Sequence, residues 1–267
     1  MGGRAIVTVW ALAIAAAIAV GLWTDPWHVR HGLFVLTLVL EIGVVALVFA
    51  VRRRLGPDDE ARRPWTWIGL GLGARVLAEL RLFTLYFHCV PGFIADRPAL
   101  NDLYIYWLRY FYVAADLLIA GALIALIRSI LGLRLGLRLG VAAPIAGALV
   151  VALPIAQLLL QRWAYAGVVF VDAGILPFRV ISVLTASLVG GLSLALARLA
   201  QQMGGGRLAL VWRAAAVAGL AKALAFLVGP ILHGSGWGGL LDQIFLWTFT
   251  GAWWLATLTY RDLVQRR

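Results

Sequence analysis

Long apolar runs follow one another along this chain of 267 residues, and short gaps that carry arginine separate them. A bilayer core about 30 Å thick is crossed by a helix of about 20 apolar residues. Hydrophobic residues make up 63% of the chain and charged residues 13%, so a soluble domain could not keep this apolar surface from water. The runs predict eight transmembrane helices, at residues 5–23, 32–51, 65–87, 104–127, 139–161, 176–198, 208–228 and 239–260.

Helices are favoured over a membrane barrel because the runs are continuously apolar. Barrel strands alternate apolar and polar residues over about ten positions, whereas a helix satisfies its backbone hydrogen bonds within one segment. The longest connections, residues 52–64 and 88–103, are too short for a separate soluble domain. We therefore expect an all-α, polytopic transmembrane helical bundle in which residues 1–267 form a single integral membrane domain.

The loop arginines predict the orientation, because cytoplasmic loops of membrane proteins are enriched in Lys and Arg. With the N-terminus inside, the outer segments hold only Arg30, Arg97 and Arg162. Arginine-rich and arginine-poor segments thus alternate along the chain, which fits an even number of spans with the N- and C-termini both cytoplasmic. We therefore expect a multi-pass protein of a bacterial cytoplasmic membrane. The fourteen inner arginines are Arg4, Arg52, Arg53, Arg54, Arg62, Arg63, Arg128, Arg134, Arg138, Arg198, Arg207, Arg261, Arg266 and Arg267.

One alternative concerns the first run, which Arg4 precedes and in which Ala17 and Ala19 resemble a signal-peptide cleavage site. Cleavage there would leave seven spans, and every remaining loop would keep its side of the membrane. The formal net charge of +11 is spread over the inner loops rather than gathered on a soluble fold. It therefore predicts contact with anionic lipid head groups at the inner face and no binding of nucleic acid.

Ionisable residues inside the runs need a separate explanation, since each costs at least ~2.5 kcal/mol at the bilayer centre unless it is paired or hydrated. All but Arg213 lie towards the middle or the outer half of their spans. Because several different spans contribute them, we expect a converging polar site in the outer half. The residues are Glu41, Arg75, Glu79, Arg81, Arg109, Asp116, Arg179, Arg213, Lys222 and Asp242.

The outer cations outnumber the outer acids by one, which predicts a net cationic cavity that an anionic substrate would balance. Arginine binds phosphate and carboxylate through paired, charge-assisted hydrogen bonds. Tyr112 follows Arg109 by three residues and so shares its helix face. We expect Arg81, Arg109, Arg179 and Tyr112 to bind a lipid- or polyprenyl-phosphate-linked group.

Lys222 is the only lysine beside 22 arginines. An ammonium group can lose its proton, whereas a guanidinium cannot, so Lys222 is a candidate proton carrier, nucleophile or Schiff-base partner. The simpler alternative is an ion pair with Asp116 or Asp242. The residues expected to carry proton chemistry, with the acids that would orient them, are Lys222, His88, His233, Glu79, Asp116 and Asp242.

All four histidines fall on the outer side in this topology. His28 and His31 are three residues apart, so one helical turn could present both to a metal ion, with Asp25 as a third ligand. The sequence has no HExxH pattern, and the lone Cys89 excludes a cysteine pair, so histidines at a wet membrane interface are the alternative. No particular cofactor is indicated.

Three classes of function agree with these residues. The first, which the concentration of charge on the outer side favours, is a membrane-embedded enzyme whose outer-leaflet cavity binds the anionic head of its substrate. The second is a transporter in which the buried charges form a substrate or proton path. The third is a sensor or assembly subunit whose buried charges only specify packing. No motif of an intramembrane protease, lipid phosphatase or prenyltransferase is recognisable in the sequence.

Overall fold

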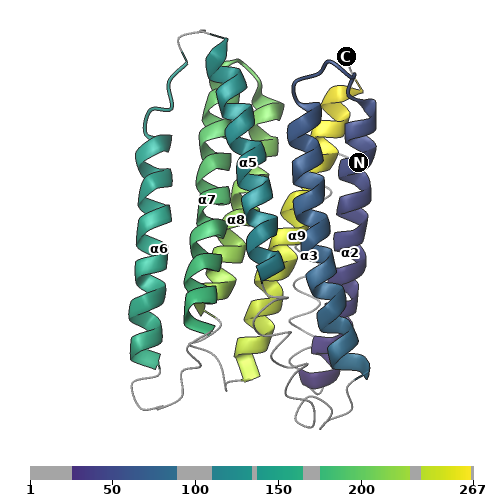
Figure 1. Ribbon diagram of the computed structural model, residues 1–267, viewed down its shortest axis with the longest axis vertical. Helices are drawn as coiled ribbons and strands as arrows, with labels where there is room; N and C mark the ends of the chain where they lie inside the picture. The colour runs from purple at the N-terminus through teal and green to yellow at the C-terminus, as the bar shows by residue number, and fades with distance from the viewer. Residues whose placement is uncertain (1–25, 89–109, 134–136, 165–174, 229–235, 266–267) are drawn as a thin grey trace.

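The computed structural model describes residues 26–88, 110–133, 137–164, 175–228 and 236–265. Side-chain positions are described for residues 36–79, 110–133, 137–159, 177–228, 241 and 244–265. This part of the chain consists of helices joined by short connections (Figure 1). The helices are α2 (Pro26–Arg54), α3 (Arg62–His88), α5 (Tyr110–Gly132), α6 (Ala142–Ala164), α7 (Ile175–Gln202), α8 (Gly206–Val228) and α9 (Gly236–Val264).

The described helices coincide with seven of the eight predicted spans, while the first, residues 5–23, lies outside the described residues. Four of them are long and apolar enough to cross a membrane: α5, α6 over Ala142–Leu159, α7 over Pro177–Gln202, and α8. The described residues contain no strand. The chain is thus a helical membrane protein, and the full number of eight spans stays a prediction.

Six of these helices close a ring. Neighbours pack in the order α2, α3, α5, α7, α8 and α9, and α9 returns to pack against α2. Helix α6 lies outside the ring, where it packs on α7 and touches α8 only slightly (Figure 1). The ring interior is therefore bounded by segments that lie far apart in the sequence.

The connections in which the sequence places most of the loop arginines lie at one end of the bundle, which we call the arginine-rich end (Figure 1). The α2–α3, α5–α6 and α7–α8 connections and the end of α9 all lie there. Gly204, with φ of 73°, makes the tight turn from α7 to α8. The α5–α6 connection is fastened to α7, because the backbone N–H and carbonyl of Arg138 both bond the side-chain amide of Gln202, at 3.0 and 2.6 Å.

Two kinds of packing hold the ring together. Near the arginine-rich end, the Trp65 ring lies 4.5 Å from that of Tyr260 and 6.3 Å from that of Trp212, measured between centroids. Between α7 and α8 the backbones touch, since a Cβ on Gly219 would lie 2.5 Å from the Gly190 nitrogen. Small residues at a helix contact permit this close approach in membranes. These aromatic side chains fill the ring near the arginine-rich end, and the polar residues of the ring lie further from that end.

Candidate functional site

A cluster of ionisable side chains occupies the ring interior, and we call it the ring cluster. Its charged members are only 1–5% exposed. Counted at 1.5 Å per residue, they lie about 20–25 Å along their helices from the arginine-rich end. All six ring helices contribute to it. The members are Glu41 from α2, Arg75 and Glu79 from α3, Asp116 from α5, Thr185 from α7, Lys222 from α8 and Thr250 from α9.

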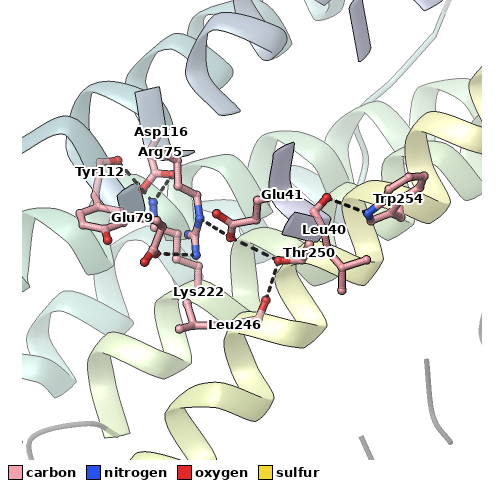
Figure 2. A network of polar contacts seen from close by, with 10 residues as sticks. All are labelled: Leu40, Glu41, Arg75, Glu79, Tyr112, Asp116, Lys222, Leu246, Thr250 and Trp254. Atoms are coloured by element: carbon pink, nitrogen blue, oxygen red, sulfur yellow. Dashed lines mark hydrogen bonds and ion pairs between the residues drawn. The ribbon is translucent and has the colours of Figure 1, made fainter. Parts of the chain in front are cut away.

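Arg75 joins two carboxylates (Figure 2). Its Nε donates to Glu41 Oε1 at 2.9 Å, and its Nη2 lies 3.6 Å from Glu79 Oε1, one helical turn further along α3. The Thr250 hydroxyl lies 3.3 Å from the same Glu41 oxygen and 3.0 Å from the Leu246 carbonyl, so it can donate to either. The bond from Arg75 to Glu41 therefore connects α3 to α2, and Thr250 adds α9.

Lys222 forms the second ion pair. Its Nζ donates to Asp116 Oδ1 at 2.7 Å and lies 3.3 Å from the Tyr112 carbonyl oxygen, one turn earlier in α5. The other Asp116 oxygen accepts a hydrogen bond from the Thr185 hydroxyl at 3.1 Å. Both oxygens of this carboxylate thus have partners, on α7 and α8, and Asp116 is the partner of Lys222 in this structure.

Two aromatic rings link the ion pairs into one cluster. The Arg75 guanidinium lies 4.0 Å from the centroid of the Phe249 ring and 5.8 Å from that of Tyr112. The Lys222 ammonium lies 5.6 Å from the Tyr112 centroid and 6.0 Å from that of Phe249. Aromatic faces attract cations at such distances, and the attraction grows where water is excluded. Both cations therefore lie near the same two rings, and each cation also has carboxylate partners of its own.

The described members of the cluster carry three carboxylates and two cations. Glu41 Oε2 and Arg75 Nη2 make no hydrogen bond within the described part of the chain. A cavity of about 10 Å³ lies beside them, bounded by Val44, Leu72 and Trp253 among others. A space of this size holds about one water molecule.

The structure brings together four of the candidates expected from the sequence: Glu79, Tyr112, Asp116 and Lys222. Glu41 and Arg75 join them as central members, although neither was expected from the sequence to have a role in substrate binding or proton chemistry. Their signal in the sequence was a charge in the middle of an apolar span. Thr185 and Thr250 gave no signal, because threonine is common in apolar helices.

Other expected site residues lie apart from the ring cluster or beyond the description. Arg179 is partly buried in α7, six residues before Thr185. Arg213 is exposed and donates to the Gln201 side chain at 3.3 Å, as expected for an arginine that reaches towards the membrane surface. The remaining candidates have side chains outside the described residues: His28, His31, Arg81, His88, Arg109, His233 and Asp242.

The described residues contain no group of three or more His, Cys, Asp or Glu side chains placed to hold a metal ion. No protein-family model matches the chain, and neither a curated protein nor a solved structure is significantly similar to it. The class of protein therefore follows from the fold and the site alone. It is an all-helical membrane protein with a sealed cluster of charges at the centre of its helix ring.

Proposed function

We propose that the protein is a multi-pass membrane transporter in which the ring cluster binds and releases protons. The observation that carries this proposal is the buried network of three ion pairs, from Arg75 to Glu41 and Glu79 and from Lys222 to Asp116, inside the ring. Ionisable residues within a membrane are costly and commonly mark ion pathways and proton relays.

The cluster contains a carboxylate oxygen that is available for a proton. Glu41 Oε2 is buried and makes no hydrogen bond within the described part of the chain. A proton there would remove a charge from a medium of low dielectric constant, where charge is costly. We therefore expect the cluster to bind and release a proton during a transport cycle.

Proton exchange would also change the packing of the helices. Neutralising Asp116 removes the carboxylate partner of Lys222, which costs about 3–5 kcal/mol unless the surroundings rearrange. Neutralising Glu41 removes one of the two carboxylates that pair with Arg75. The partners sit on different helices, α5 with α8 and α2 with α3. A change in protonation would therefore shift the balance between two arrangements of the ring, as alternating access requires.

Proton flux into proteoliposomes tests this proposal. An imposed membrane potential should drive internal acidification, followed with an enclosed pH-sensitive dye, faster than in protein-free liposomes. Asp116→Asn should abolish the difference. Asp262→Asn is the matched control, because that aspartate is exposed at the arginine-rich end, and it should keep the flux. Equal flux in wild type and Asp116→Asn, or none above empty liposomes, would contradict the proposal.

A second candidate is a membrane-embedded enzyme with a net cationic outer-leaflet cavity for a lipid- or polyprenyl-phosphate-linked substrate. Arg179 supports it, since this partly buried cation lies about 9 Å beyond Thr185 on the side away from the arginine-rich end. Arg81, Arg109, Arg179 and Tyr112 would bind the anionic group in this hypothesis. Lys222, His88 and His233 would transfer protons, oriented by Glu79, Asp116 and Asp242.

The enzyme hypothesis predicts a different pattern of defects. Arg109→Lys and Arg179→Lys should each abolish function in a strain that lacks the chromosomal copy, because lysine cannot reproduce bidentate binding. Full complementation by both variants would remove the support for a cationic substrate site.

Cysteine labelling tests the orientation in a bacterial cytoplasmic membrane, with both termini cytoplasmic. In a Cys89→Ser background, a membrane-impermeant thiol reagent applied from outside should modify Ser235→Cys and leave Asp58→Cys unmodified. The reverse pattern would show that the arginine-rich end faces outwards.

A further inference from the structure

A second charged region lies at the arginine-rich end, well away from the ring cluster. It is a cavity of about 560 Å³ between the α2–α3 connection and the last turns of α5. We call it the inner pocket. Six ionisable residues line it, three basic and three acidic: Arg52, Arg62, Arg63, Asp58, Asp59 and Glu60.

The arginines of the inner pocket are placed to bind a phosphate group. The Arg52 side chain is positioned by a hydrogen bond from its Nε to the Thr66 hydroxyl at 2.9 Å. The Thr66 hydroxyl in turn donates to the Arg62 carbonyl. The Arg62 Nε is buried, with no hydrogen-bond partner among the described residues. Helix α3 begins at Arg62, so its N-terminal N–H groups add positive potential. None of Arg52, Arg62 and Arg63 forms an ion pair within the described ranges.

The acidic residues of the inner pocket restrict which other charged groups the ligand can carry. Asp59 accepts a bond from the Ala61 backbone N–H at 2.9 Å, and Glu60 accepts one from the Ser129 hydroxyl. Asp58 is exposed at the cavity, with no partner in the described part of the chain. Three carboxylates beside three guanidinium groups would repel a ligand that is negative throughout. They favour a zwitterion whose phosphate meets the arginines and whose ammonium group meets the carboxylates.

An apolar surface continues from the inner pocket along α3 and α5. Trp67 and Ala125 line the cavity on the membrane side. Beyond them, Leu70 and Leu77 of α3 are 49% and 59% exposed, and Leu117 and Ile124 of α5 are 53% and 37% exposed. These positions recur at helical spacing on two helices that pack together, so they extend the site towards the middle of the membrane. A charged pocket above an apolar track matches a lipid better than a soluble metabolite.

We propose that the inner pocket binds the head group of a phospholipid with a primary amine, a phosphoethanolamine lipid, whose acyl chains lie along α3 and α5. The phosphate is bound by Arg52, Arg62 and Arg63, and the amine by Asp58 and its acidic neighbours. The inference is independent of proton transport, because the two sites share no residue.

Native mass spectrometry of the detergent-solubilised protein tests the site. We expect phosphatidylethanolamine to remain bound in preference to phosphatidylcholine and phosphatidylglycerol of the same acyl chains, by fivefold or more. Arg62→Gln should reduce binding of all three lipids, whereas Asp58→Asn should remove only the preference for ethanolamine. Arg207→Gln is the control, since Arg207 is exposed at the same end outside the cavity.

The outcomes show which head group the inner pocket prefers and whether its ligand is a lipid or a soluble compound. Equal retention of the choline and ethanolamine lipids, or stronger retention of the glycerol lipid, would overturn the zwitterion proposal. Binding of the three lipids unchanged by Arg62→Gln would overturn the site itself. Glycerophosphoethanolamine, which lacks acyl chains, should not compete. If it binds as tightly as the lipid, the inner pocket takes a soluble ligand and the lipid proposal fails.

Discussion

Helices α6 and α8 are both 23 residues long and apolar enough to span a membrane, yet they take opposite positions. Of the apolar span, 61% is buried in α8 and 11% in α6. Helix α8 turns alanines and Lys222 inwards, whereas α6 exposes branched side chains such as Val151 and Leu159. Lipid is as apolar as leucine, so hydrophobicity alone does not draw a helix into a bundle. Close-packing small residues and charges that need partners place α8 in the ring.

The largest effect on the free energy of unfolding is expected at Lys222, through which α8 forms an ion pair inside the ring. Lys222→Met leaves Asp116 buried without its cation and should lower the free energy of unfolding by about 3–5 kcal/mol. Adding Asp116→Asn should restore most of that loss, since no isolated charge remains. Chemical unfolding in detergent measures both changes.

The same double variant also separates a functional pair from a structural one. Proton flux should stay absent although the protein is stable again. Recovery of flux would mean that the pair serves packing alone. A double variant as unstable as Lys222→Met would show that the ion pair is not the source of the stability.

One substitution made in both helices sharpens the comparison. A Cβ on Gly219 of α8 would lie 2.5 Å and 2.8 Å from the backbone of Gly190, so Gly219→Ala should push α7 and α8 apart and cost about 1–3 kcal/mol. Gly147 of α6 has open space around it, and Gly147→Ala should raise stability by up to about 1 kcal/mol through helix propensity. Thermal unfolding checks both. Equal losses would contradict the different packing of the two helices.

Gln157 is a polar residue within the apolar part of α6. It is fully buried, and its amide nitrogen and oxygen have no hydrogen-bond partner in the described residues. Gln157→Met keeps the side-chain length and removes the unsatisfied amide, so stability should rise by about 1 kcal/mol. Thr185→Val, which removes a bond to Asp116, should instead lower it. A loss in both variants would indicate a bound partner for the Gln157 amide.

The smallest effect belongs to the outer face of α6. Leu159 is 64% exposed, and Leu159→Ala should change the free energy of unfolding by no more than about 0.5 kcal/mol. Leu196→Ala is the matched control, because Leu196 is fully buried in α7 and should cost about 2–5 kcal/mol. A comparable loss at Leu159 would show that this face of α6 is covered in the solubilised protein.

The sequence alone predicted the seven described helices, because long apolar runs favour helices in lipid. It also predicted which of their ends lie together, because arginines mark the connections on one side of a membrane. It also singled out Lys222. The spacing of four residues between Tyr112 and Asp116, and between Arg75 and Glu79, places each pair on one helix face. These are properties of single helices.

Only the tertiary structure decided which helices are neighbours. Glu41 and Thr250 meet although 209 residues separate them, and Lys222 pairs with Asp116 in α5 and also lies against Phe249 in α9. In lipid, all apolar faces of a helix are nearly equivalent, so the pattern of hydropathy does not specify its partners. Close backbone contacts such as Gly190 with Gly219, and the requirement that every buried charge find its opposite, select one arrangement. Both depend on distances between helices, which only the folded chain defines.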